Sequence, residues 1–458
     1  MKNKLLSTLA KFEKFGTGIC FERISLAYDL LKLRSHFYTA HITVITGTNG
    51  KGSTAHALSN LLVNAGKETG LFTSPHFIEF NERFIHQGRP IDYQTLNQQM
   101  DRLLPIVQQI QTILSQKFGT FEVLFLLALC VFESKKIAYL VIEAGIGGRF
   151  DPVRTLQAPL CALTSVDLEH TELLGKTIEA IACDKLDATP PKGHCVIGQL
   201  TPNINNQDSS NNHRLESILA AYAQASEFTT SRAEDEVSIA VLNRSANKTA
   251  KQLTLRINLN DPTLPPFNLT VAHLSDIQIL NWQSALALYK RLSKLVKLRD
   301  QNANLSCHPK IIEQALNTPP LSGRFQTIAQ NPTIIIDSAH TPNAYRWLFN
   351  TIKADYQDKP CVFVVGLSIG RNIEQFKHII GSLDSTIVTT QAHNGIDAQQ
   401  LANQLDSQWA FADIADAINK AKQIALEQNG RIFIVGGLFL GASASAYLQG
   451  LPYRDLNF

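Results

Sequence analysis

The sequence lacks the features of a membrane or secreted protein. Its longest apolar stretch, residues 123–132, is about half the length that a bilayer-spanning helix needs, and a glutamate flanks each end. The seven cysteines are an odd number without a CxxC pair, which is the usage of a reducing compartment. Near the N-terminus, Lys11, Glu13 and Lys14 interrupt any apolar signal core. We therefore expect a cytoplasmic protein without a membrane partner, and a buried helix over residues 123–132.

The sequence also lacks any concentration of charge of one sign. Lys and Arg number 42 against 39 Asp and Glu, for a net charge of +3, and no block of five or six like charges occurs. This distribution argues against a nucleic acid partner, whereas it is compatible with a small anionic substrate. We expect small-molecule substrates and a monomeric chain.

The length and the apolar pattern indicate the fold class. A chain of 458 residues with 44% hydrophobic residues exceeds one ordinary core, so we expect two domains. Short β-branched runs that alternate with segments of helical periodicity predict buried parallel strands in an α/β fold. Such runs occupy residues 42–45, 139–142, 160–166, 333–336, 361–365, 386–389 and 431–435.

The domain boundary is expected after the helical stretch at residues 279–298, because residues 299–307 are polar and lack periodicity. The predicted fold is a P-loop ATPase-like N-terminal domain with a mainly parallel sheet over residues 1–300. A smaller Rossmann-like α/β domain follows over residues 301–458. Within the first domain, the Asn- and Ser-rich residues 201–213 are expected to form a solvated loop.

A glycine-rich loop follows the first apolar run. Gly47-Thr48-Asn49-Gly50-Lys51-Gly52-Ser53 lies between that strand and a helix expected from about Thr54 to Ala65. In this context glycines let backbone N–H groups approach phosphates, Lys51 supplies a charge, and a hydroxyl binds Mg²⁺. Gly52 occupies the usual Ser/Thr position of the Walker form, and Ser53 follows it. The alternative is a glycine-rich turn without a ligand, and the flanking strand and helix favour an ATP site.

Polar residues also follow the other predicted strands, where ligands of parallel sheets collect. Glu143 precedes a glycine-rich segment, residues 144–149, and either reaches a Mg²⁺ on the phosphate loop or is a surface glutamate. His170 is favoured as a ligand over an ordinary histidine only by its position at the same sheet edge. Lys185 has no local pattern that distinguishes it from a solvated lysine. Residues 322–325 and 337–340 form either a ligand site or a structural ion pair.

Taken in order, these motifs make the chain similar to the folylpolyglutamate synthase/dihydrofolate synthase family, a branch of the Mur-type ligases. The similarity extends over most of the chain. The matching segments are residues 21–24, 47–53, 73–76, 81–83, 121–122, 143–149, 164–165, 170–171, 174–175, 323–325 and 337–340.

The resemblance implies ATP-dependent addition of L-glutamate to dihydropteroate and to reduced folates through an acyl phosphate. It also implies that a hinge near residues 299–307 lets the C-terminal domain close over the nucleotide. The implied catalytic residues are Lys51, His170 and Lys185. The implied nucleotide-binding residues are Gly47, Thr48, Asn49, Gly50, Lys51, Gly52, Ser53, Asn281, Arg324, Asp337 and His340. Two Mg²⁺ sites are implied at Ser53, Ser74, Glu143, His170 and a carbamylated Lys185, and pterin contacts at Phe77, Arg83, Phe121 and Asp151.

The sequence departs from the family's pattern in several segments. The departures are Asp151-Pro152-Val153-Arg154 for Asp-Ala-Thr-Asn, Asp184-Lys185-Leu186-Asp187 for Glu-Lys-Ala-Gly, Ser322-Gly323-Arg324 for Pro-Gly-Arg, His340-Thr341-Pro342 for His-Asn-Pro, and Arg371-Asn372 for Lys-Asp. A monofunctional folylpolyglutamate synthase, another Mur-type ligase and a non-catalytic ATP- or folate-binding paralogue are therefore alternatives. Cell-wall ligases are disfavoured because only 46 residues precede Gly47, fewer than the about 50 of a small domain.

Overall fold

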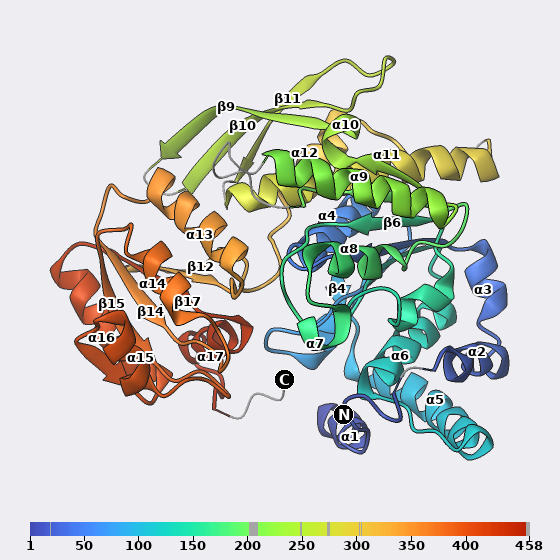
Figure 1. Ribbon diagram of the computed structural model, residues 1–458, viewed down its shortest axis with the longest axis horizontal. Helices are drawn as coiled ribbons and strands as arrows, with labels where there is room; N and C mark the ends of the chain where they lie inside the picture. The colour runs from blue at the N-terminus through green and yellow to red at the C-terminus, as the bar shows by residue number, and fades with distance from the viewer. Residues whose placement is uncertain are drawn as a thin grey trace. The chain divides into compact units, whose positions relative to one another are not determined.

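The chain divides into two compact units in a computed structural model that describes residues 1–18, 20–200, 209–247, 250–272, 275–301, 303 and 305–454. The first unit comprises Met1–Ser74, Asn81–Ala272 and Leu280–Thr318, and the second comprises Pro75–Phe80, His273–Ile279 and Pro319–Phe458. Figure 1 follows the chain through both units by colour. Two short segments that precede residue 300 thus belong to the second unit, and the first unit extends past residue 300 to Thr318.

An eight-stranded sheet forms the centre of the first unit, in the order β4-β3-β2-β5-β1-β6-β7-β8. The six strands from β2 to β8 in this order are parallel, whereas β3 and β4 are antiparallel additions. The strands are β1 (His41–Thr46), β2 (Thr69–Phe72), β3 (Phe84–His86), β4 (Arg89–Pro90), β5 (Tyr139–Glu143), β6 (Leu160–Leu163), β7 (His194–Ile197) and β8 (Thr229–Arg232). The predicted mainly parallel sheet is confirmed, although β6 ends three residues before the predicted Val166.

The helices of the first unit include the expected buried helix. All residues from Val123 to Phe132 are buried in α6, because that helix is apolar around its whole circumference. The helices are α1 (Lys2–Leu9), α2 (Phe21–Leu30), α3 (Arg34–Thr39), α4 (Lys51–Asn64), α5 (Tyr93–Leu114), α6 (Thr120–Ser134), α7 (Thr171–Leu174), α8 (Ile178–Leu186), α9 (Ser209–Ala225), α10 (Ala233–Glu236), α11 (Asp276–Arg299), α12 (Pro309–Leu316) and the 3₁₀ helices η1 (Phe80–Arg83) and η2 (Pro152–Leu156). Residues 276–279 of α11 fall in the second unit.

Two helix boundaries differ from the expectations. Helix α4 begins at Lys51 rather than Thr54, because Gly50 adopts a left-handed conformation and starts the helix directly after it. The loop expected over residues 201–213 is wrong from Ser209 onward, where α9 begins, and residues 201–208 lie outside the described residues. The first residues of α9 are Ser and Asn, which are typical of loops, so the sequence did not indicate where the helix begins.

A three-stranded antiparallel sheet, which the apolar runs do not predict, also belongs to the first unit. It contains β9 (Ser238–Asn247), β10 (Ala250–Asn258) and β11 (Phe267–Ala272) in the order β11-β10-β9. Leu253, Leu255 and Ile257 are buried on β10, while the alternate residues Gln252 and Arg256 are exposed. This period of two is the signature of a half-buried strand, and it is weaker than a continuous apolar run.

The second unit contains a six-stranded sheet in the order β12-β13-β17-β14-β15-β16, parallel except for β12. Its strands are β12 (Gln326–Gln330), β13 (Thr333–Asp337), β14 (Cys361–Val365), β15 (Ser385–Thr390), β16 (Trp409–Phe411) and β17 (Arg431–Val435). Its helices are α13 (Pro342–Asp355), α14 (Ile373–Ile380), α15 (Ala398–Leu405), α16 (Ile414–Glu427) and α17 (Leu438–Leu448). The α/β class predicted for both halves is confirmed.

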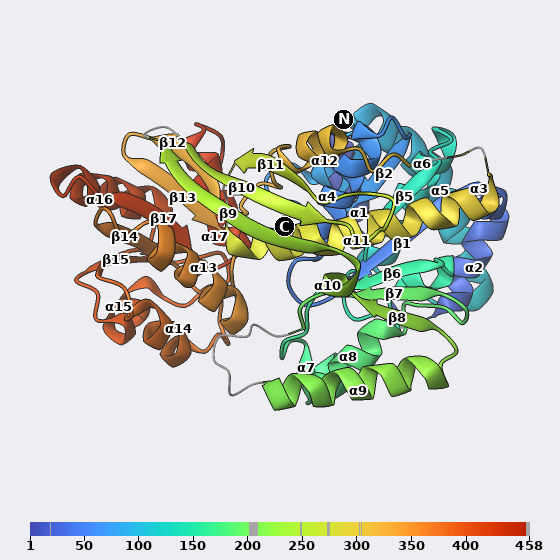
Figure 2. The ribbon, with the colours of Figure 1, turned by 90° about the horizontal axis from the view of Figure 1, so that it is seen from above.

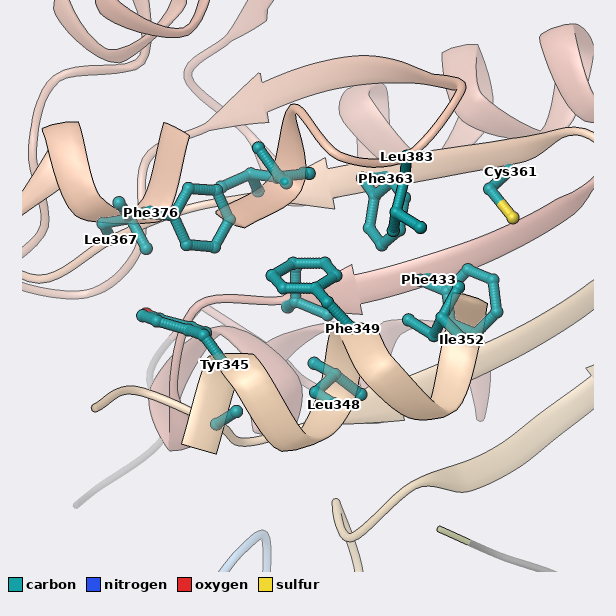
Figure 3. Packing of buried hydrophobic residues seen from close by; sticks show 14 of the residues in the cluster. Tyr345, Leu348, Phe349, Ile352, Cys361, Phe363, Leu367, Phe376, Leu383 and Phe433 are labelled. Atoms are coloured by element: carbon teal, nitrogen blue, oxygen red, sulfur yellow. The ribbon is translucent and has the colours of Figure 1, made fainter. Parts of the chain in front are cut away.

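Aromatic packing forms one side of the core of the second unit. Figure 3 shows Tyr345 and Phe349 of α13 turned toward Phe363, Phe376 and Phe433. The rings of Phe363 and Phe433 stack at 5.4 Å because these residues are in register on β14 and β17. Among the described residues, no helix is long and apolar enough to cross a membrane.

Candidate active site

The loop of residues 47–53, which is the expected phosphate loop, leaves the central strand of the first sheet. Strand β1 lies between β5 and β6, and the chain order reverses there, which is where parallel sheets bind ligands. Gly47 and Gly50 have φ angles of +139° and +84°. A Cβ atom at Gly47 would lie 2.0 Å from Thr164 Oγ1, and one at Gly50 would lie 2.4 Å from Asn281 Oδ1. Both positions therefore require glycine, and Asn281 is brought beside the loop as expected.

Two hydroxyl residues after β6 hold this loop in shape. The Thr164 hydroxyl donates to Asn49 O at 2.7 Å, and Asn49 N donates to Ser165 Oγ at 2.9 Å. Thr48 N donates to Ser165 O at 2.8 Å. The sequence predicted a continued strand here, whereas Thr164 and Ser165 support the loop instead. Such fixed backbone geometry is what a phosphate site needs before its ligand arrives.

The Lys51 side chain lies along the phosphate loop. Its Nζ donates to Gly47 O at 2.9 Å and to Thr48 O at 3.2 Å. Lys51 is also the first residue of α4, and Ser53 is buried in the first turn of that helix. The positive end of a helix and an ammonium group thus coincide at one loop, which favours an anion such as a phosphate.

Glu143 ends β5 directly beside the phosphate loop. It is paired in register with Ile45 of β1, and its buried carboxylate accepts a hydrogen bond from Ser74 N at 3.0 Å. Arg83 is buried nearby; burial lowers the pKa of Arg83 to about 10, while Glu143 and Glu82 act in the opposite direction. Glu143 is therefore an internal carboxylate and not a surface residue.

The oxygen donors at this edge fit Mg²⁺. The expected ligands combine the Glu143 carboxylate with the hydroxyl groups of Ser53 and Ser74, all hard donors. In the described parts of the chain, no three His, Cys, Asp or Glu side chains gather as a metal site. A single carboxylate suits Mg²⁺, since this ion keeps several waters and binds substrate phosphates with one or two carboxylates.

Lys185 is buried, which corrects the reading of its local pattern as that of a solvated lysine. Its side chain is 2% exposed, and its Nζ donates to Gly47 O at 3.0 Å and to Glu169 Oε1 at 3.0 Å. The pKa of Lys185 is lowered to about 8, first by burial and then by the charge of Lys51, against the opposing effect of Glu169. Helix α8 thus brings an amine onto the loop of residues 47–53, and its ion-pair partner is Glu169, a residue to which the sequence assigned no role.

His170 lies next to Glu169 but remains partly open to solvent. Its φ is +46°, its side chain is 43% exposed, and its Nδ1 lies 3.8 Å from Glu172 Oε1. Burial raises the pKa of the Glu169 carboxyl, whereas the nearby Lys51, Lys185 and His170 side chains lower it, and the net effect is a lowered pKa. The structure therefore gathers the three expected catalytic residues around Glu169.

Asp151 organises the glycine-rich segment after β5. Its Oδ2 accepts hydrogen bonds from Gly145 N (2.8 Å) and Ile146 N (3.1 Å), and its Oδ1 accepts one from Val153 N (3.0 Å). Phe121 packs against the same segment, since a Cβ atom at Gly145 would lie 2.7 Å from the Phe121 ring. Asp151 thus holds the start of this segment and the start of η2 through its two carboxylate oxygens.

The buried Asp151 predicts a specific dependence of stability on pH. Burial raises its pKa from 3.8 to about 6, against the opposing effect of three backbone N–H groups. Between these values the folded chain keeps a proton that the unfolded chain releases, so the free energy of unfolding falls as the pH rises through this window. The loss amounts to about 3 kcal/mol. Asp151→Asn should remove this fall in denaturant titrations at pH 4 to 6.5, and parallel curves for both proteins would contradict the shifted pKa.

Phe77 lies in a different unit from the other expected pterin contacts. It belongs to the core of the second unit, where a Cβ atom at Gly323 would lie 2.3 Å from the Phe77 ring. Arg83, Phe121 and Asp151 belong to the first unit. The division between the units falls within η1, between Phe80 and Asn81, and no feature of the sequence marks it.

Asp337 joins the two expected nucleotide segments of the second unit. Its Oδ2 accepts from Phe325 N at 2.9 Å, and its Oδ1 accepts from Ala339 N at 2.8 Å. Burial raises the pKa of Asp337, whereas Arg324 lowers it. His340 Nδ1 lies 3.0 Å from Ser338 O. Arg324, Asp337 and His340 are thus gathered at the end of β13, as expected from the sheet edge.

The chain is similar in sequence to a known ligase domain and to proteins of known function. The model of the Mur ligase, glutamate ligase domain matches residues 323–438. A dihydrofolate synthase/folylpolyglutamate synthase of Buchnera aphidicola is 23% identical over 412 residues, which cover 88% of this chain and 84% of the relative. The enzyme of that name from Escherichia coli is 24% identical over 423 residues, covering 91% and 88%.

Solved structures share the fold over nearly the whole chain. A Mycobacterium tuberculosis folylpolyglutamate synthase complexed with ADP and AMPPCP has a TM-score of 0.80 at 23% identity, covering 100% of this chain and 99% of its own. An Escherichia coli structure in complex with DHPP and ADP has a TM-score of 0.78 at 23% identity, covering 97% and 98%. Both the fold and the sequence comparisons extend through the two units.

Proposed function

Because this chain belongs to the folylpolyglutamate synthase/dihydrofolate synthase family, a branch of the Mur-type ligases, we propose that it adds L-glutamate to dihydropteroate and to reduced folates in an ATP-dependent reaction. The observation that carries this proposal is the phosphate loop at the centre of the first sheet, with Lys51, Lys185 and Glu143 around it. We assign ATP and pterin binding to residues 1–300 and the glutamate-ligase role to residues 301–458, in keeping with the domain match at residues 323–438.

The proposed chemistry proceeds through an acyl phosphate. An oxygen of the acceptor carboxylate attacks the γ-phosphorus of ATP, and the bond to the β-phosphate oxygen breaks to release ADP. The α-amine of glutamate then attacks the acyl carbon, loses a proton, and releases inorganic phosphate as the amide forms. No protein nucleophile is needed, so the chain contributes by positioning and by charge. Lys51 and the first turn of α4 stabilise the phosphoryl oxygens.

The residues around this loop have distinct proposed roles. Ser53, Ser74 and Glu143 would hold one Mg²⁺, and His170 with a carbamylated Lys185 would hold a second. Bound Mg²⁺ supplies positive charge that neutralises phosphate oxygens and orients them. Carbamylation requires a neutral amine, and a pKa of about 8 leaves about a tenth of Lys185 neutral at pH 7. The Lys185 ammonium would give up its contact with Glu169, since a carbamate and that carboxylate repel each other.

The remaining proposed contacts concern the nucleotide and the pterin. Asn281, Arg324, Asp337 and His340 are assigned to the nucleotide, and the gathering of the last three at the end of β13 supports that assignment. Phe77, Arg83, Phe121 and Asp151 are assigned to the pterin. The contact of Phe121 and Asp151 with one glycine-rich segment supports these two in particular.

Glu143→Gln should weaken the response to Mg²⁺ without unfolding the protein. The amide keeps an oxygen that can accept from Ser74 N, but it removes the negative charge that a hard cation prefers. The Mg²⁺ concentration for half-maximal ADP formation should rise by about tenfold or more, since even indirect changes at a metal ligand have effects of that size. Glu68→Gln, at an exposed pair with His86, is the control. An unchanged Mg²⁺ titration would mean that Glu143 is structural.

Product analysis tests the proposed function. Purified protein is given ATP, Mg²⁺, glutamate and either dihydropteroate or a reduced folate, and the products are weighed by mass spectrometry. Both acceptors should gain the mass of one glutamyl residue. Extension of the folate alone would reduce the proposal to a monofunctional folylpolyglutamate synthase, an alternative favoured by Pro152, which stiffens the start of η2. ATP binding without any product would support the non-catalytic alternative.

A further inference from the structure

The glycine-rich segment after β5 lies directly on the C-terminal end of α8. Gly148 N donates to Asp184 Oδ1 at 3.0 Å, and Arg149 N donates to Asp184 O at 2.8 Å. A Cβ atom at Gly147 would lie 2.3 Å from Asp184 Oδ1, and one at Gly148 would lie 2.4 Å from Lys185 O. The close approach of the two backbones therefore depends on glycine at both positions.

Three side chains close a hydrogen-bonded triangle beside this contact. Arg149 Nε donates to Asp187 Oδ2 at 2.5 Å, Arg149 Nη2 donates to the Tyr222 hydroxyl at 3.1 Å, and that hydroxyl donates to Asp187 Oδ1 at 2.8 Å. Figure 2 shows α8 beside α9, the helix that carries Tyr222. Each of the three side chains is hydrogen-bonded to the other two, and both carboxylate oxygens of Asp187 accept a hydrogen bond. The triangle therefore fixes the Arg149 side chain in one orientation.

The opposite end of the same segment is also held. Arg154 Nη1 donates to Arg149 O at 3.1 Å, and Asp151 accepts from Gly145 N and Ile146 N. Residues 151–154 and 184–187, where the sequence departs from the family's pattern, thus both contact Gly148 or Arg149. The segment is fixed by α8 and α9 on one side and by Asp151 and η2 on the other.

We propose that Arg149, Asp187 and Tyr222 are positioning residues that hold residues 145–151 as a fixed wall of the acceptor site. This inference rests on the proposed function, since Phe121 contacts the segment, Asp151 belongs to it, and both are assigned to the pterin. The triangle touches no reacting atom. Its loss lets the wall move, which weakens the binding of the acceptor and leaves Lys51 and Lys185 on Gly47 O.

Tyr222→Phe tests the triangle with the smallest change, because it removes one hydroxyl and keeps the ring. Tyr289→Phe is the matched control: that hydroxyl donates to Ser306 O at 2.9 Å in the same unit, away from the segment. Tyr222→Phe removes two hydrogen bonds of the triangle, so the KM for the pterin acceptor should rise by about fivefold or more, since one hydrogen bond contributes a factor of about five. The KM for ATP should equal that of the control.

Hydrogen exchange gives a second readout that does not depend on catalysis. Backbone amides of residues 145–151 should exchange about fivefold faster in Tyr222→Phe than in Tyr289→Phe. Asp187→Asn should act in the same direction, and if it fails to fold, Tyr222→Phe decides alone. Equal exchange in the two tyrosine variants, or a rise in the KM for ATP equal to that for the acceptor, would overturn the proposal. If the wild-type protein glutamylates no acceptor, the proposed function fails and hydrogen exchange still tests the triangle.

Discussion

Lys51→Ala is expected to lower the rate of glutamate ligation by about a thousandfold or more. Preorganised positive charge at a transferring phosphoryl group contributes effects of that size, and an alanine leaves the developing charge without its ammonium partner. The measurement is the initial rate of ADP formation with acceptor and glutamate present. Folding should be unaffected, because the half-buried Lys51 side chain donates to two backbone oxygens of its own loop, Gly47 O and Thr48 O.

Lys67→Ala provides the control for this loss. Lys67 is also half-buried and follows the opposite end of α4, so its removal changes the charge near the same helix without touching the phosphate loop. It should retain wild-type turnover, and both variants should melt close to the wild-type temperature. Wild-type turnover in Lys51→Ala would refute the assignment of residues 47–53 as the phosphate loop.

Lys185→Ala is expected to lose ligation by about a hundredfold, and formate or acetate should partly restore it. The rescue follows because a small carboxylate can occupy the position of the carbamate oxygens. Rates are measured with increasing formate at fixed ionic strength. Neither loss nor rescue would occur for an ordinary surface lysine, so full activity in the alanine variant would remove Lys185 from the site.

Lys185→Ala is also expected to lower the stability of the fold, and this effect must be distinguished from a direct effect on catalysis. In the uncarbamylated chain, Lys185→Ala leaves the Glu169 carboxylate, which is 15% exposed, without its ion-pair partner, and breaking such a pair costs about 3–5 kcal/mol. The double variant Lys185→Ala/Glu169→Gln removes both charges and should regain thermal stability. If activity returns with stability in the double variant, Lys185 serves only the fold.

The glycine-rich loop of residues 47–53 and the sheet that carries it could be predicted because their signals are local. A β-branched run, seven loop residues and an apolar helix follow one another from residue 42, and each element agrees with the next. The buried helix over residues 123–132 has an equally local cause, since no polar residue interrupts it. Local agreement also explains why the parallel strands of the second unit were found.

The environment of Lys185 could not be predicted, because its contacts are distant in sequence. Gly47 O lies 138 residues away along the chain, and the partner Glu169 is separated from Lys185 by a loop and α7. The assignment of residues 75–80 to the second unit has the same cause. The contacts of Lys185 and the placement of residues 75–80 depend on how helices and strands pack. The periodicity of a short stretch of sequence gives no information about that packing.

Transfer of an oxygen atom from the acceptor carboxylate to inorganic phosphate is the most direct test of activation through an acyl phosphate. An acceptor labelled with ¹⁸O in its reactive carboxylate is incubated with the protein, ATP, Mg²⁺ and glutamate, and the inorganic phosphate is weighed by mass spectrometry. One ¹⁸O atom should pass into the phosphate for each amide formed. Amide formation with unlabelled phosphate, or with the label in AMP, would contradict the acyl phosphate.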